Sequence, residues 1–168
     1  MNIVFFGNPL HGDDAVGYHI YNELIQLCQD QQICDKNSAV KLHFAGSSAL
    51  DAVKYFTDTD SVIVVDAHLP AGKPGKIEIL MPDELYSEGD YLSIHRFSVY
   101  ETIKAMQAEG LDLPEIRLLT VEAKLVNTFS LDISEEVSAV VKPVSELLLK
   151  LIKQNQSQLK FFNQVYAN

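Results

Sequence analysis

Residues 2–17 read NIVFFGNPLHGDDAVG, and this stretch decides the fold class. The almost continuously apolar run Asn2–Gly7 is typical of a strand that is buried on both faces of a sheet. Helical spacing follows, because the next apolar side chains fall on one stripe: Val16, Ile20, Leu24 and Leu27. A buried strand that leads through a short loop into a helix begins a β-α-β unit. The stretch therefore predicts an α/β fold.

The rest of the chain continues to alternate strands with helices. Val40–Phe44 alternates apolar and polar side chains, which indicates a half-exposed strand near an edge of the sheet. Ser61–Ala67 is apolar enough for a strand that is buried on both faces, and a further strand is predicted at Glu115–Val121. The predicted helices are Ser47–Thr57, Phe97–Glu109, which closes at Gly110, and Ile133–Lys153, which Ser134 caps.

One strand is predicted to run against the others. The segment 68–75, HLPAGKPG, is too short for a crossover helix, so the strand Lys76–Leu80 should run antiparallel to Ser61–Ala67. The sum is a three-layer α/β/α sandwich around a mostly parallel sheet. Residues 1–153 are expected to form one domain, and 154–168 an extension that is helical or partly disordered.

The composition of the chain argues against nucleic-acid binding and against membrane insertion. The chain has 168 residues and a formal net charge of -10, without the basic cluster that nucleic-acid binding requires. No apolar run approaches the length of a membrane helix, and no basic segment precedes the apolar N-terminus, which we therefore interpret as a strand and not a signal peptide. We expect a cytoplasmic protein without membrane insertion, in which Cys28 and Cys34 are free thiols.

Three candidate ligands converge on one edge of the predicted sheet. Asp14 follows the first strand, Asp66 closes the third, and His95 lies in the loop SIHRF ahead of a helix. In open α/β sheets, functional residues gather beyond the carboxyl ends of the strands. Two carboxylates and an imidazole suit a borderline divalent ion such as Ni²⁺ or Zn²⁺. The sequence therefore predicts a metal site at this edge.

Each of these residues also has a plain structural interpretation. Asp13 or Asp14 can cap the following helix, although capping accounts for only one of two neighbours. Asp66 can accept hydrogen bonds from loop amides, and His95 can be an ordinary loop histidine. His68, two residues after Asp66, is either a fourth ligand or an exposed loop residue, and we favour the latter.

The sequence lacks the motifs of several other kinds of active site. Gly7 and Gly12 have the spacing of a phosphate loop, but the GK[ST] that would follow is missing, and so is GxGxxG. Two aspartates at the turn also repel a phosphate from the helix N-terminus. The chain contains no GxSxG serine motif and no HExxH zinc motif.

Two motifs resemble those of a known family. GNPLHGDDAVG is similar to the GNxLxxD(D/E)xxG opening of the hydrogenase maturation endopeptidases, which trim the C-terminus of the nickel-iron hydrogenase large subunit. VIVVDAHLPAGKPGKI resembles their second motif, a strand that ends in Asp-Ala before a Pro-Gly loop. SIHRF lies where the family has its loop histidine, and EIRLLTVEA matches a later strand. The similarity covers roughly Met1 to Lys153.

The resemblance implies a fold, a metal site and a substrate. The family's sheet is mixed, with order 2-1-3-5-4 and strand four antiparallel, in a phosphorylase/hydrolase-like α/β/α sandwich. Its metal-contacting residues correspond here to Asp14, Asp66 and His95. The implied function is endopeptidase removal of the C-terminal extension of a nickel-iron hydrogenase large-subunit precursor. The substrate supplies the Ni²⁺, for which Zn²⁺ or another divalent ion can substitute, and Asp14 or Asp66 can also act catalytically as a general base.

The remaining motif residues are expected to shape the turn. We interpret Asp14 as the metal ligand and Asp13, also a possible additional ligand, as the helix cap. Gly7, with Asn8 and Gly12, should form the turn that leaves the first strand. Gly17 should lie where the first helix packs closely on the sheet.

The chain departs from the family pattern in several places. Phe5 replaces the first glycine of GxGN, and Ala45–Ser48 replaces an Asp/Gly-Gly-Thr pattern in a region that the family associates with substrate recognition. Ala123 replaces a proline, and Phe129–Ser134 keeps a trace of Gly-Leu-Ser. These differences leave two alternative functions open, a non-catalytic metal-sensing chaperone of a hydrogenase subunit and a small-molecule hydrolase on the same fold.

Overall fold

The computed structural model describes residues 1–31, 33, 39–82, 84, 99–125 and 129–154. The predicted ligand His95, Cys34 and residues 155–168 of the C-terminal extension lie outside the described residues. Within the described part of the chain, no helix is long and apolar enough to cross a membrane.

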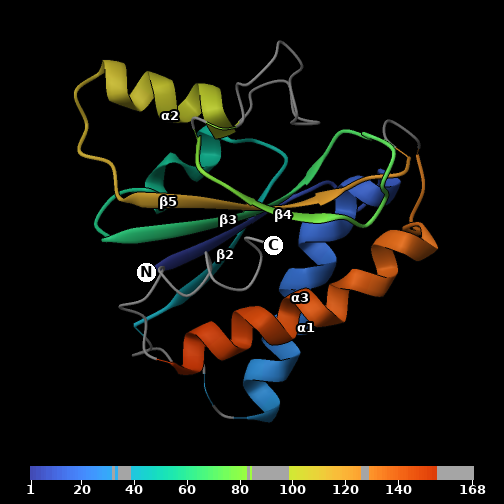
Figure 1. Ribbon diagram of the computed structural model, residues 1–168. Helices are drawn as coiled ribbons and strands as arrows, with labels where there is room; N and C mark the ends of the chain where they lie inside the picture. Colours follow the sequence, from blue (N-terminus) through green and yellow to red (C-terminus); the bar gives the residue numbers. More distant parts are fainter. Residues whose placement is uncertain (32, 34–38, 83, 85–98, 126–128, 155–168) are drawn as a thin grey trace.

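A mixed five-stranded sheet forms the centre of the molecule (Figure 1). Its strands are β1 (Asn2–Phe6), β2 (Lys41–Gly46), β3 (Ser61–His68), β4 (Ile77–Leu80) and β5 (Glu115–Glu122). They lie in the order β2-β1-β3-β5-β4. β1 pairs in parallel with β2 and β3, β3 pairs in parallel with β5, and β4 is antiparallel to β5. The expected strand order and the reversal of β4 are thereby confirmed.

Helices cover both faces of the sheet (Figure 1). Alternate residues of β1 point to opposite faces, because side chains in a strand have a period of two. Ile3 and Phe5 belong to the core on the side of α1 (Val16–Asp30) and α3 (Glu135–Lys153). Val4 and Phe6 belong to the core that includes α2 (Val99–Ala108) and lies beside the 3₁₀ helix η2 (Leu50–Tyr55). This arrangement is the predicted α/β/α sandwich.

Two sequence-based expectations are corrected. Residues 47–57 were expected to form a short helix, whereas the structure forms a 3₁₀ helix over Leu50–Tyr55 only. Cys28 is disulfide-bonded and is not a free thiol. Cys28 lies on the buried face of α1, near the end of that helix. Local sequence patterns predict which face of a helix is buried, but they do not predict whether a second thiol comes within bonding distance.

Gly17 lies at the closest approach of α1 to the sheet. A Cβ atom at this position would come within 3.0 Å of the Phe6 carbonyl oxygen, a separation that real Cβ atoms essentially never show. The same Cβ would lie 3.1 Å from the carbonyl oxygen of Val65. The missing side chain lets the first turn of α1 rest against the backbones of β1 and β3, and it brings the segment before the helix to the carboxyl edge of the sheet.

Candidate functional site

A tight turn carries the chain from the end of β1 to the first candidate carboxylate. Gly7 has φ +140°, a conformation that L side chains rarely adopt, and a Cβ there would clash with the Asp14 carbonyl oxygen. The Asn8 side-chain oxygen accepts a hydrogen bond from the amide of Leu10 at 3.1 Å. The chain turns again at Gly12, where φ is +59°. Residues 7–12 therefore fold back beside the end of β1.

Asp14 and Asp66 lie at the same edge of the sheet. Asp14 belongs to the 3₁₀ helix η1 (Gly12–Ala15), which contacts β3. Asp66 directly follows Val65, the β3 residue that pairs with Phe5 at the end of β1. Both side chains are buried, with exposed fractions of 2% for Asp14 and 4% for Asp66. The structure thus places both carboxylates at the carboxyl end of β1, with Asp66 on β3 level with the last residue of that strand.

Each carboxylate accepts a local hydrogen bond that orients it. The Asn8 amide donates to Asp14 Oδ2 at 3.1 Å, which holds Asp14 against the turn. The Ala67 amide donates to Asp66 Oδ1 at 2.8 Å. His95 is the third predicted ligand, and its position lies outside the described residues. Within those residues, no group of three or more His, Cys, Asp or Glu side chains could hold a metal ion. The described part of the site therefore consists of the two aspartates.

The structure corrects the expected role of Asp13. Neither η1 nor α1 has a side-chain cap, so Asp13 does not cap the first helix. Its Oδ1 accepts a hydrogen bond from the Ser134 amide at 2.6 Å, and its Oδ2 accepts one from the Ser134 hydroxyl at 2.9 Å. The amides of Lys124 and Leu125 donate to Oδ2 at 2.8 and 3.0 Å. Asp13 is thus a buried anchor that joins η1 to the end of β5 and the start of α3.

The same contacts explain Ser134. This residue occupies the N-cap position of α3, as the sequence predicts, but its side chain makes no capping hydrogen bond. The hydroxyl donates to Asp13 instead. The carboxylate of Asp13 therefore accepts both donors of Ser134 at the helix N-terminus, where a negative charge is favourable.

His68 is buried and is not the exposed loop residue that the sequence suggested. It is the last residue of β3 and is 3% exposed. Its Nδ1 lies 2.8 Å from the Leu69 carbonyl oxygen, and its Nε2 lies 3.5 Å from Oε2 of Glu78 on β4. The strand β3 continues through His68 and is buried along its whole length, whereas the sequence placed His68 in the loop. The second nearby histidine, His11, is half-buried and forms an isolated bridge with Ser130.

Glu122 lies at the edge of the candidate site and was not predicted from the sequence. It ends β5, pairs in register with His68 and is 1% exposed. Burial alone raises the pKa of its carboxyl. Hydrogen bonds from the backbone amides of Lys73 and Ala71, together with the nearby His68, outweigh this effect and lower the pKa below its usual value. A glutamate that directly follows the apolar Val121 at the end of the predicted strand was the available signal.

The altered segment Ala45–Ser48 lies beside the turn. Gly46 ends β2, and its carbonyl oxygen accepts a hydrogen bond from the Gly7 amide at 2.9 Å. The chain leaves the strand at Gly46 with φ +69°. This contact places the segment that differs from the family pattern directly next to the loop that carries Asp14.

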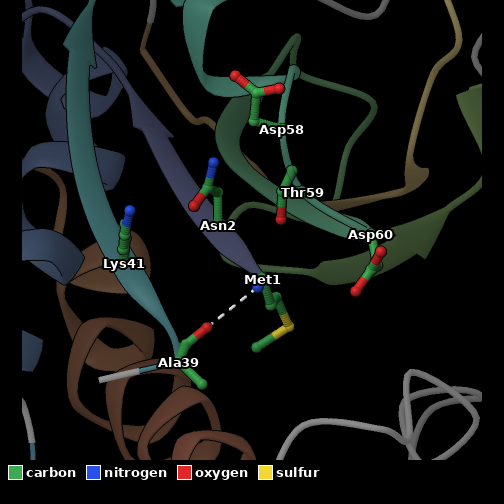
Figure 2. Close-up of a pocket in the computed structure, with 7 residues that line it drawn as sticks. All are labelled: Met1, Asn2, Ala39, Lys41, Asp58, Thr59 and Asp60. Atoms are coloured by element: carbon green, nitrogen blue, oxygen red, sulfur yellow. Dashed lines mark hydrogen bonds between the residues drawn. The ribbon is translucent and has the colours of Figure 1, made fainter. Parts of the chain in front are cut away.

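A pocket of about 260 Å³ lies at the opposite edge of the sheet. Figure 2 shows its lining, which comes from the amino ends of three strands: Met1, Asn2, Ala39, Lys41, Asp58, Thr59 and Asp60. The N-terminal amino group donates to the Ala39 carbonyl oxygen at 3.1 Å across this pocket. The amino ends of the strands are remote from Asp14 and Asp66, so this pocket is separate from the candidate site.

Two of the solved structures that share this fold are hydrogenase maturation proteases. The hydrogenase maturating endopeptidase HybD from E. coli matches with a TM-score of 0.71 and 20% identity, covering 91% of each chain. The [NiFe] hydrogenase maturation protease HycI from Thermococcus kodakarensis matches with a TM-score of 0.69 and 22% identity, covering 90% of this chain and 91% of that one. The chain therefore has the fold of this class of hydrolase.

The sequence comparisons establish the family. The model of the HycI family, hydrogenase maturation protease, matches residues 22–151. Protein FrxA of Pyrococcus furiosus is 26% identical over 149 residues, which cover 86% of this chain and 99% of that protein. The chain belongs to the hydrogenase maturation protease family. Its members are endopeptidases of hydrogenase maturation.

Proposed function

We propose that this protein removes the C-terminal extension of a nickel-iron hydrogenase large-subunit precursor and recognises the nickel that the precursor already carries. Asp14, Asp66 and His95 are the proposed ligands of that nickel. The ion is part of the substrate in this proposal, so a precursor without nickel is not bound in a productive way.

The observation that carries the proposal is the burial of Asp14 and Asp66 at one edge of the sheet. A buried carboxylate is costly unless hydrogen bonds or a positive charge compensate it, and two neighbouring carboxylates also repel each other. A divalent ion would relieve both effects. Two carboxylate oxygens and one imidazole nitrogen suit the borderline character of Ni²⁺ or Zn²⁺.

The contacts of Asp13 support the division of roles in the Asp-Asp pair. Its carboxylate accepts four hydrogen bonds from Lys124, Leu125 and Ser134, which account for its burial. Asp14 belongs to the same short helix but lies beside the end of β1. We therefore assign the structural role to Asp13 and the ligand role to Asp14.

Three ligands leave coordination positions that the precursor's own groups can occupy. Binding then depends on the maturity of the precursor and not only on its peptide sequence, which gives the enzyme a check against premature cleavage. In this proposal, Asp14 or Asp66 can also act as the general base that takes a proton from the attacking water.

The test is C-terminal processing of the cognate precursor, followed as a shift in electrophoretic mobility, with nickel-loaded and nickel-free precursor. We expect cleavage of the loaded form alone, and loss of cleavage in Asp14→Asn and Asp66→Asn. Asp51→Asn, an exposed aspartate in η2, is the control and should cleave normally. Equal cleavage of both precursors by the wild type would contradict nickel recognition.

A non-catalytic metal-sensing chaperone is the second candidate. The observation that favours it is the position of Ala45–Ser48, which differs from the family pattern and lies beside the turn at Gly7. Stable binding of the nickel-loaded precursor without any cleavage would select this function over the endopeptidase.

A further inference from the structure

Glu122 lies on the same face and at the same edge of the sheet as Asp66. The register pairs Asp66 with Thr120 and His68 with Glu122 in two parallel strands. Because side chains alternate with a period of two, all four of these residues point to one face. This is the face of Val62 and Val64, which pack toward α2. Glu122 therefore lies level with His68, two residues beyond Asp66 toward the carboxyl edge of the sheet.

A single residue anchors the loop that follows Asp66 and His68. This segment, Leu69–Lys76, is called the β3–β4 loop below. The Glu122 Oε1 atom accepts hydrogen bonds from the amides of Ala71 at 2.7 Å and Lys73 at 2.5 Å. The Glu122 backbone accepts a hydrogen bond from Gly75 and donates one to Lys76, both at 2.8 Å. The middle and the end of the loop are therefore attached to Glu122.

The loop packs closely against the start of α3. Gly75 has φ +79°, and a Cβ there would lie 2.6 Å from the Glu136 carbonyl oxygen. In contrast, the residues at the tip are exposed, namely Ala71, Gly72 and Lys73. The β3–β4 loop thus exposes residues to solvent while its backbone amides are fixed on Glu122, and it begins three residues after Asp66.

A short Pro-Gly connection does not require a buried charge to form a turn. The Glu122 carboxylate is nevertheless 1% exposed, and an ionised group at such a position is costly unless it is hydrogen-bonded. The lowered pKa of Glu122 indicates that the amide donors keep it ionised. The carboxylate therefore holds the loop in one conformation. Ordinary turn residues alone would allow that conformation to vary.

We propose that Glu122 is a positioning residue that holds the β3–β4 loop as a fixed wall beside Asp66, against which the precursor segment next to the scissile bond lies. This inference rests on the proposed endopeptidase function. Glu122 acts through the loop and does not touch the reacting atoms. Its loss should therefore weaken precursor binding more than it slows the chemical step.

The test compares Glu122→Met with the wild type on the nickel-loaded precursor. Methionine keeps a similar volume without the acceptor, and the freed amides belong to exposed residues that water can reach, so the fold should persist. We expect KM to rise about tenfold while kcat stays within about twofold, because ordering a few loop residues opposes binding. Hydrogen exchange of the Ala71 and Lys73 amides should become faster. Glu115→Met, an exposed position at the other end of β5, is the matched control and should change neither quantity.

Glu122→Gln is the second variant, since its carbonyl oxygen can accept the same two amides. It should restore most of the KM that Glu122→Met loses. An unchanged KM in Glu122→Met, despite faster exchange of the loop amides, would overturn the inference. A KM for Glu122→Gln as high as that of Glu122→Met would also overturn it. A wild type that does not cleave the loaded precursor would instead refute the proposed function, so the two failures are distinguishable.

Discussion

Replacing Asp13 with asparagine should destabilise the protein strongly, although the two side chains have nearly the same shape. Both oxygens of the Asp13 carboxylate accept hydrogen bonds. Oδ1 accepts one from the Ser134 amide, and Oδ2 accepts three, from the amides of Lys124 and Leu125 and from the Ser134 hydroxyl. Asparagine has one acceptor oxygen, so its NH₂ group must face at least one of these N–H donors. At least one hydrogen bond is then lost at a residue that is 1% exposed.

The expected magnitude follows from these contacts. Hydrogen bonds to a charged group contribute about 1.5–3 kcal/mol each, and the buried donor left without an acceptor adds its desolvation. We therefore expect a loss of about 3 kcal/mol in the free energy of unfolding. For a domain of this length, that loss corresponds to a decrease in Tm of roughly 6–12 °C.

Urea denaturation and a thermal scan measure this change directly. Asp14→Asn is the matched control, because it makes the same chemical change one residue away. The Asp14 contact with the Asn8 amide needs only an acceptor oxygen, which asparagine retains. Its stability should stay within about 1 kcal/mol of the wild type. Similar stability losses in the two variants would refute the separate roles assigned to Asp13 and Asp14.

Three further predictions concern packing, pH and metal binding. Gly17→Ala should lower the free energy of unfolding by about 2 kcal/mol in urea denaturation, because the clash with Phe6 outweighs the better helix propensity. The exposed control Asn22→Ala should leave the free energy of unfolding unchanged. An unchanged free energy of unfolding in Gly17→Ala would disprove the close packing. The folded-state pKa of Glu122 lies below its ordinary value of 4.5, so its ionised form stabilises the fold above that pH, and this stabilisation is lost as the pH falls through the folded pKa. The difference in unfolding free energy between the wild type and Glu122→Gln should therefore be constant from pH 7 to about pH 5.5 and shrink below pH 4.5; a difference that grows in acid would show the opposite shift. His95→Ala should weaken Ni²⁺ binding in calorimetry by roughly tenfold or more, with an unchanged circular dichroism spectrum; undiminished binding would remove His95 from the ligand set.

The fold was predictable because its signals are local and periodic. The apolar run of β1 and the stripe of Val16, Ile20 and Leu24 describe elements whose burial repeats at the spacing of a strand or a helix. The reversal of β4 followed from the length of the connection alone. Its pairing with β5 needed the family resemblance, since strand order depends on contacts that are distant in sequence.

The roles of single buried polar residues were not predictable in the same way. Asp13 looks like a helix cap in its local sequence, but its partner Ser134 is 121 residues away. Glu122 likewise accepts a hydrogen bond from Ala71, 51 residues away. His68 looked exposed because the predicted strand ended at Ala67, whereas β3 continues through His68 and is buried along its length. Helix and strand patterns report which face is buried, whereas the partner of a buried polar group is set by tertiary structure.

The most direct test of nickel recognition is the affinity of the protein for its cognate precursor with and without nickel, measured by calorimetry before cleavage proceeds. The account predicts that the nickel-loaded precursor binds at least about tenfold more tightly, a difference of about 1.4 kcal/mol. It also predicts that Asp14→Asn and Asp66→Asn bind the two forms equally. Equal affinity of the wild type for both forms, or an undiminished preference in these variants, would contradict the account.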